Sequence, residues 1–140
     1  MKYSATLVCG AFLFTGALGT SFAGEESIGA AEYKSNCAAC HGISGKGDGP
    51  FAEYLKSGAP SLTVLKKNNG GVFPVDKVYQ LIDGRGLAKG HGTREMPIWG
   101  AQYTAQSVKE HGPFFGEWYA QDVIQARILA LISHINTLQE

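Results

Sequence analysis

The chain has 140 residues, and its 12 basic and 12 acidic side chains give a formal net charge of zero. This length favours a single domain. The balanced charge, without a basic run, argues against a nucleic-acid-binding protein and gives no reason to expect attachment to an anionic membrane surface.

The first 23 residues have the pattern of a secretory signal peptide. Lys2 is followed by an apolar stretch over residues 5–18, and small residues precede a cleavage point after Ala23. An uncleaved membrane anchor is the alternative, but the apolar run is shorter than the roughly 20 residues that cross a bilayer, and glycines interrupt it. We therefore expect cleavage after Ala23, a mature domain over residues 24–140, and a periplasmic location.

Cleavage would change the composition of the protein. It would remove Lys2, leaving 11 of the 12 basic side chains and all 12 acidic ones, a net charge of −1. It would also remove Cys9 and the first of the two methionines. The mature chain then has two cysteines and one methionine, namely Cys37, Cys40 and Met96.

Helix signals lie mainly at the two ends of the mature chain. Ser27 is a suitable N-cap for a proline-free helix over residues 28–36. Near the other end, Asp122 is a suitable cap for a helix that starts at Val123. Its apolar residues recur at spacings of four and three and form one stripe: Ile124, Ile128, Leu131, Ile135 and Leu138.

The middle of the chain is rich in glycine and predicts loops with short helices. One short helix is expected over residues 75–82, with Pro74 ahead of it and Gly84 as its stop. No segment alternates cleanly enough to predict a strand. We therefore predict an all-α fold with long loops, and because such loops lose much entropy on ordering, a large apolar group is expected at their centre.

The motif with the clearest chemistry is Cys37-Ala38-Ala39-Cys40-His41. A C-x-x-C-H sequence is typical of c-type haem attachment: both thiols add to vinyl groups of one haem, and the histidine faces the iron. His41 would be neutral, with one ring nitrogen on iron and the other donating to a backbone carbonyl.

Three other interpretations of the cysteine pair remain open. A thioredoxin-like redox pair would accompany a βαβ pattern, which is not seen here. Half of a zinc site would need histidines, since no second cysteine pair exists. A structural disulfide is compatible with an exported protein. The combination of motif and export signal favours haem.

Met96 is the expected sixth ligand of the iron. It is the only methionine of the mature chain, and Pro97 pushes it into an extended conformation from which its flexible thioether can reach across the haem. A methionine that fills a gap in the core is the alternative. The competing ligands are the three remaining histidines, of which the first is nearest to Met96 in sequence: His91, His111 and His134.

The sequence resembles the class I c-type cytochromes of the bacterial, single-haem kind. The stretches that carry the resemblance are CAACHGISGKGDGP at 37–50, PSLT at 60–63 and MPIWG at 96–100. The resemblance implies a small cytochrome c fold whose N- and C-terminal helices cross around one covalently bound haem c, and a methionine followed by proline as sixth ligand.

The resemblance also implies how these two helices cross. A glycine and an aromatic residue of the first helix, here Gly29 and Tyr33, would pack against an apolar and an aromatic residue of the last helix. Leu131 fits the apolar position, but His134 stands at the aromatic one. The contact would then be sensitive to pH, because histidine titrates near neutrality.

Three further residues have candidate roles around the haem. In the family, a proline after the motif often supplies the carbonyl for the histidine; Pro50 would do so, or would only form a turn. Arg85 would pair with a haem propionate, or would be a solvated loop charge. Trp99 would pack near the haem edge.

The resemblance does not explain residues 111–119, of which four are aromatic. They would form a flap that adds apolar burial over the haem, or a docking surface for a redox partner. The flap is favoured, because a small domain needs most of its aromatic residues for burial.

The filled iron coordination predicts an electron carrier and not an enzyme, because Met/His ligation raises the reduction potential and leaves no open position. We expect a monomer that shuttles between a donor dehydrogenase or quinol complex and a terminal oxidase or reductase. The alternatives are a haem c subunit of a stable periplasmic oxidoreductase complex, and a sensor or enzyme with a labile sixth ligand. No nucleic-acid partner and no stable membrane insertion after cleavage are expected.

Overall fold

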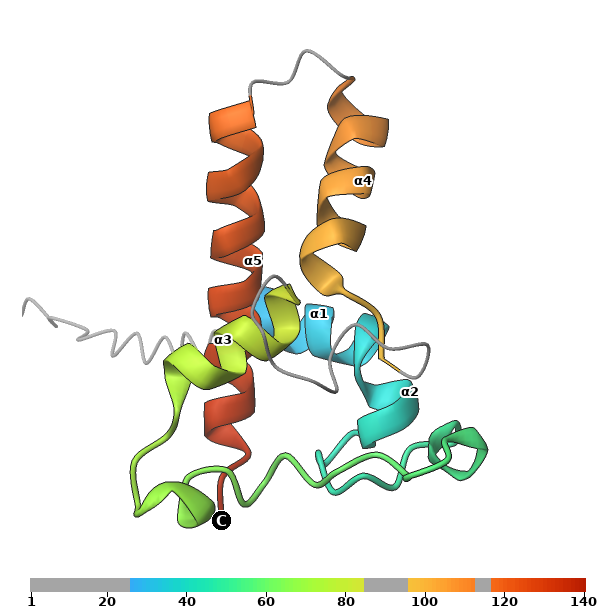
Figure 1. Cartoon of the computed structure of the whole chain (residues 1–140), viewed down its shortest axis with the longest axis vertical. Helices are drawn as coiled ribbons and strands as arrows, with labels where there is room; N and C mark the ends of the chain where they lie inside the picture. The colour runs from blue at the N-terminus through green and yellow to red at the C-terminus, as the bar shows by residue number, and fades with distance from the viewer. Residues whose placement is uncertain (1–25, 85–95, 113–116) are drawn as a thin grey trace, which may run out of the picture.

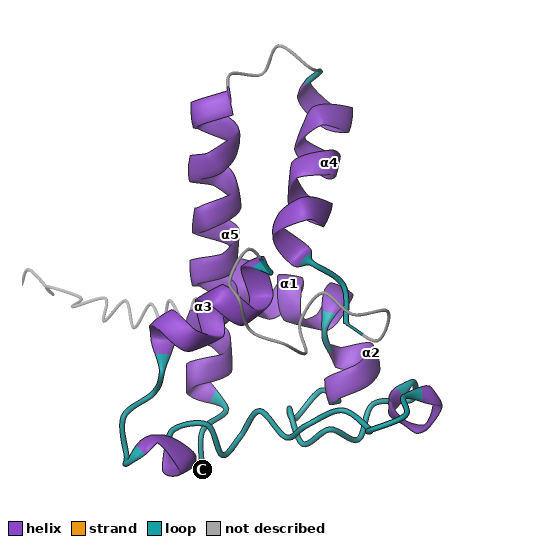
Figure 2. Cartoon of the chain, viewed as in Figure 1, coloured by secondary structure: helices purple, strands orange, loops and turns teal. Residues whose placement is uncertain are grey.

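The computed structural model describes residues 26–84, 96–112 and 117–140, with the side chains of 117–119 excepted. The predicted signal peptide, Arg85 and His91 lie outside these ranges, as do residues 113–116 of the aromatic segment. The described residues form five α-helices and two short 3-10 helices, without a strand (Figures 1 and 2), which confirms the all-α prediction. In chain order they are α1 (Ile28–Asn36), α2 (Ala38–His41), η1 (Ala52–Tyr54), η2 (Lys67–Asn69), α3 (Val75–Asp83), α4 (Trp99–His111) and α5 (Glu117–Thr137).

The first helix has the predicted bounds and cap. The Ser27 Oγ accepts a hydrogen bond from the Ala30 N–H at 3.2 Å, which satisfies one of the free donors at the start of α1. The helix ends at Asn36, and Cys37, with a φ of −117°, is both the C-cap of α1 and the N-cap of the short helix α2. The haem motif therefore starts at the junction of two helices.

The helices α1 and α5 cross in close contact, as the resemblance implied (Figure 1). A Cβ on Gly29 would overlap the backbone oxygen of Ala130, so only glycine allows this approach. Next to it, the rings of Tyr33 and His134 lie 5.0 Å apart at an angle of 49°. The histidine thus occupies the position of the second aromatic residue and packs there.

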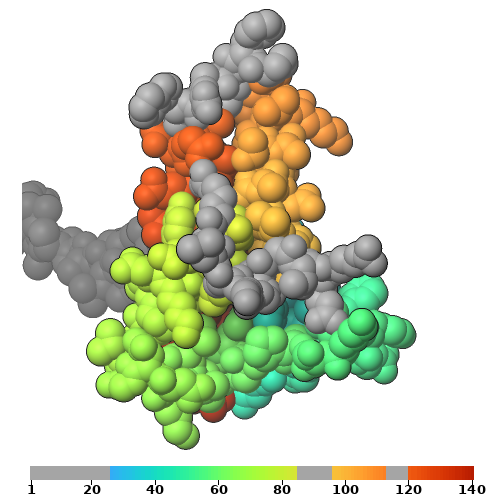
Figure 3. All heavy atoms as spheres, in the orientation of Figure 1, coloured from blue at the N-terminus to red at the C-terminus, as the bar shows by residue number. Residues whose placement is uncertain are grey.

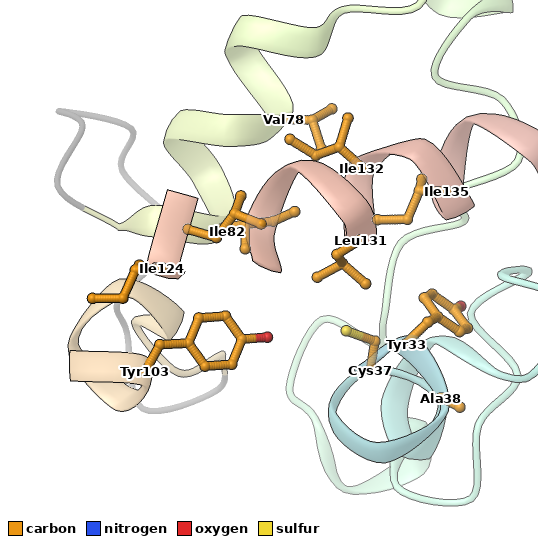
Figure 4. Close-up of a cluster of buried hydrophobic side chains, with 11 residues drawn as sticks. Tyr33, Cys37, Ala38, Val78, Ile82, Tyr103, Ile124, Leu131, Ile132 and Ile135 are labelled. Carbon is orange, nitrogen blue, oxygen red and sulfur yellow. The ribbon is translucent and has the colours of Figure 1, made fainter. Parts of the chain in front are cut away.

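The helix α5 runs between α1 and α3 and provides the centre of the core (Figure 4). Four members of the predicted apolar stripe are almost fully buried: Ile124, Ile128, Leu131 and Ile135. The fifth, Leu138, packs at the edge of the core. The predicted start of this helix was wrong. The helix begins at Glu117, because it extends on the N-terminal side of the apolar stripe and packs against α4. Asp122 therefore lies inside the helix and is not its cap.

The short middle helix, α3, also agrees with the prediction: it starts after Pro74 and ends at Gly84, whose φ of 75° is left-handed. In contrast, α4 was not predicted. Its buried face consists of Gly100, Tyr103 and Ser107, which do not form a recognisable apolar stripe. Figure 3 shows the side chains of α4 packed along α5.

Among the described residues, the helices lack the combination of length and hydropathy that a membrane span requires.

Candidate functional site

A cavity of about 410 Å³ opens between α2, α3, α5 and the start of α4. Its wall is mainly apolar, as is usual for a site that holds a cofactor. The apolar side chains come from all parts of the chain: Leu55, Leu62, Leu65, Val78, Leu81, Ile82, Leu131 and Ile135. Five predicted site residues line the same cavity: Cys37, Cys40, His41, Met96 and Trp99.

One helical turn brings the motif residues together. The N–H groups of Cys40 and His41 both bond to the Cys37 carbonyl oxygen, at 3.1 and 2.9 Å. Because α-helix geometry places residues three and four apart on one face, both cysteines and the histidine face the cavity. Both cysteines are free thiols, with Cys37 buried and Cys40 half-buried.

The environment of Cys37 differs from that of a redox-active thiol. Burial, with a smaller contribution from the negative charge of Glu32, raises the pKa of Cys37 to about 12. A thiol of a disulfide oxidoreductase instead has a lowered pKa, which makes it a thiolate near neutral pH. The surroundings of this pair therefore do not favour the thioredoxin-like interpretation.

His41 is buried, and its Nδ1 lies 3.0 Å from the carbonyl oxygen of Pro60. Burial lowers the pKa of His41, while the bond to Pro60 acts in the opposite direction. A neutral ring that donates from Nδ1 keeps a lone pair on Nε2, which is the form that binds a metal. The ring is thus held in the tautomer that iron ligation needs.

The carbonyl partner of His41 was predicted to be Pro50, and this was wrong. Residues 42–51 fold back onto α2 instead: the N–H groups of Gly47 and Phe51 bond to the carbonyl oxygens of His41 and Ala39, both at 2.8 Å. In this loop Pro50 is exposed, and it does not line the cavity. Pro50 therefore forms part of the turn, which was the alternative interpretation.

The segment that does reach His41 crosses over this loop. The Leu62 N–H bonds to the Gly45 carbonyl oxygen at 2.7 Å, and a Cβ on Gly47 would overlap the backbone oxygen of Ala59. Close passage of the two segments sets Pro60 beside the imidazole. The PSLT stretch, which begins at Pro60, was one of the stretches that carried the resemblance. It could therefore have indicated the carbonyl partner of His41, but no role was predicted for it.

Met96 lines the same cavity, is half-buried and lies outside any helix, as expected. Three residues later Trp99 starts α4, and its ring packs on Tyr103 with centroids 5.9 Å apart. Both Met96 and Trp99 face the space that His41 faces. Among the competing histidines, His111 is exposed at the end of α4 and His134 packs against Tyr33, so neither lines the cavity.

The donor set fits a covalently attached haem. Two free thiols lie one turn apart with a neutral imidazole beside them, and a thioether lines the same apolar cavity. Thiols are the groups that add to haem vinyls, and imidazole with thioether is a common axial pair for haem iron.

The sequence profile of the family described as "Cytochrome c" matches residues 27–124. No curated protein and no solved structure matches the chain significantly. The match covers most of the chain, including the cysteine motif, Met96 and the first part of α5. The chain therefore belongs to the cytochrome c family of haem electron-transfer proteins, and it binds a covalently attached haem c.

Proposed function

We propose that this protein is an exported, class I bacterial cytochrome that carries one electron at a time between redox proteins of the periplasm, with His41 and Met96 as the axial ligands of a single haem. The observation that carries the proposal is the cavity itself, since one apolar space is lined by both thiols, the imidazole and the thioether. When attached, the haem supplies the Fe(III)/Fe(II) couple.

The residues of the chain determine what this couple can do. Cys37 and Cys40 hold the group covalently, and Pro60 orients the His41 ring. The apolar side chains around the cavity keep water from the site and so favour the less charged, reduced state. Met96 in the sixth position raises the reduction potential and leaves no vacant position for oxygen or peroxide. These are properties of a carrier.

The optical spectrum tests the ligand assignment. The oxidised protein is expected to show the weak far-red band of iron–sulfur ligation, and Met96→Ala should abolish this band while the haem stays attached. The matched control is His91→Ala, which should leave the band unchanged. A wild-type spectrum of the bis-histidine type that disappears in His91→Ala would contradict the assignment.

Two further measurements test the remaining parts of the proposal. Carbon monoxide should not bind readily to the reduced wild-type protein, whereas a sensor or enzyme with a labile sixth ligand would bind it. Export predicts that the mature protein is recovered from the periplasm with Gly24 as its first residue. Recovery of the full chain in the membrane fraction would contradict cleavage.

A second candidate function is that of a haem subunit in a stable oxidoreductase complex. In that case residues 111–119, of which four are aromatic, would form its permanent interface, because aromatic residues are enriched in interfaces. Purification from the native source distinguishes the two. A carrier is expected to migrate as a monomer, and a subunit would co-purify with a partner in constant ratio.

A further inference from the structure

A polar network joins α1, α4 and α5 behind the cysteine motif, and Glu32 is its centre. One carboxylate oxygen, Oε1, accepts from the Arg127 Nε and pairs with its Nη2, both at 2.8 Å. The other, Oε2, accepts from the Tyr103 hydroxyl at 3.0 Å and from the Asn36 amide at 2.9 Å. The Glu32 side chain is only 13% exposed, so the pair is partly shielded from water.

The Arg127 guanidinium is held in place from several directions. Besides Glu32, it bonds through Nη1 to the Gln106 amide oxygen at 3.0 Å, and its central carbon lies 4.1 Å above the centre of the Tyr103 ring. A planar guanidinium that pairs and stacks at the same time has little freedom, and lysine cannot reproduce both contacts. The positive charge is therefore fixed beside the carboxylate.

The network lies against the wall of the haem cavity. Asn36, which bonds to Glu32, lines the cavity, and the Tyr103 ring packs on Trp99, which also lines it. Figure 4 shows Tyr103 pointing from α4 toward Cys37 and Leu131. Burial raises the pKa values of Cys37 and Tyr103 most, and the negative charge of Glu32 raises both as well, so its field reaches Cys37 in this wall.

A charge at this place acts on the redox equilibrium. When the protein accepts an electron, the site loses one unit of positive charge. A nearby carboxylate therefore stabilises the oxidised state, and a nearby cation stabilises the reduced state. Screening is weaker for partly buried charges than for charges in water, so the effect persists at physiological salt.

We propose that Arg127 tunes the reduction potential of this cytochrome by neutralising the Glu32 carboxylate behind Cys37. Arg127 acts through Glu32 and touches no cavity atom, so it is a positioning residue for charge. The inference rests on the electron-carrier function proposed above and deepens it, because the potential decides which partners can give or take the electron.

Redox titration of the haem-loaded protein, with the two charges removed singly and together, tests the proposal. Glu32→Gln leaves the guanidinium, which cannot lose its proton, and should raise the potential by about 59 mV, a tenfold change for a one-electron couple. Arg127→Met should have the opposite effect and lower the potential. The double variant should return close to the wild-type value, and Arg127→Lys should stay closer to it than Arg127→Met does.

The control is an exposed ion pair of the same protein, Lys46 with Glu140, whose side chains are 59% and 56% exposed at a separation of 3.2 Å. Lys46→Met should leave the potential unchanged, because solvent screens such pairs. The far-red band is recorded for every variant, so that a shift from displaced ligands is recognised.

An unchanged potential in Glu32→Gln would overturn the proposal. So would shifts of the same sign in Glu32→Gln and Arg127→Met, since these would report altered packing and not charge. Carbon monoxide binding to the wild-type protein would instead contradict the carrier function, independently of how the variants titrate.

Discussion

In one part of the cavity wall, the five-residue motif 37–41, made of α2 and its N-cap Cys37, provides both thiols and the imidazole, and backbone hydrogen bonds hold the chain around it. Another part of the wall contains Met96, which lies outside any helix, three residues ahead of α4. Its surroundings depend on how α4 meets α3: a Cβ on Gly100 would lie 2.6 Å from the Asp83 carbonyl oxygen. The His41 side is thus built from local sequence, and the Met96 side from contacts between distant segments.

We therefore expect the two proposed ligands to respond to different changes. The His41 side should fail only when the motif or the main helix crossing fails. The Met96 side should respond to small shifts of α4 that leave the rest of the fold intact. Four variants test this contrast.

The largest effect is expected from removal of both thiols of the motif. Cys37→Ala with Cys40→Ala should abolish covalent haem attachment completely, because the third cysteine of the chain, Cys9, lies outside the motif. Haem staining after denaturing electrophoresis measures this directly. The control is Cys9→Ala, which should keep full staining, and residual staining in the double variant would place the attachment elsewhere.

Next in size is Gly29→Ala at the helix crossing. The added methyl group would meet the backbone oxygen of Ala130, which cannot move away without separating α1 from α5. We expect a loss of about 1–3 kcal/mol in the free energy of unfolding, typical of overpacking. Ser35→Ala, at an exposed position of the same helix, should change it by less than about 0.5 kcal/mol. The far-red band of the folded fraction should persist.

Gly100→Ala tests the other side of the cavity. The new methyl group would push the start of α4 away from Asp83 and carry Met96 with it. We expect a loss of about 1 kcal/mol in stability, at the low end for overpacking, together with a weaker far-red band and easier carbon monoxide binding. Ala101→Ser, exposed on the same helix, is the control. If Gly29→Ala weakened the band as much as Gly100→Ala does, the contrast between the two sides would be wrong.

The smallest effect is expected from Tyr33→Phe, which removes the hydrogen bond from the Tyr33 hydroxyl to the Gly42 carbonyl oxygen at 2.7 Å. The loss should be about 1 kcal/mol at neutral pH, as for a typical intramolecular hydrogen bond. Tyr54→Phe, whose side chain is 75% exposed, should have no effect.

Tyr33 also predicts a dependence on alkaline pH. Burial raises its pKa to about 12 from the ordinary value of 10.0, so the folded protein holds the phenol proton more tightly than the unfolded chain. The resulting stability is fully present below pH 10 and is lost as the pH rises toward 12. Denaturant unfolding across this interval should therefore show a smaller decline in Tyr33→Phe than in the wild type.

Much of the fold followed from patterns that depend only on neighbouring residues. Ser27 caps the start of α1, and Gly84 ends α3 with a left-handed φ. The apolar stripe of the last helix predicts the face that is buried. The helix α4 escaped prediction because its buried face combines glycine, tyrosine and serine. Such a face is buried only because α3 and α5 lie against it, and periodic hydropathy does not record that.

The candidate site likewise has one part that the sequence predicts and one part that depends on tertiary packing. The sequence by itself determined the cysteine pair and His41, because a fixed spacing on one helical turn needs no other part of the chain. It also singled out Met96, by elimination. Only the tertiary structure decided that Pro60 and not Pro50 faces His41, and that Glu32, Tyr103 and Arg127 meet behind the motif. These contacts join segments 19 to 95 residues apart, and such pairings depend on how helices and loops pack.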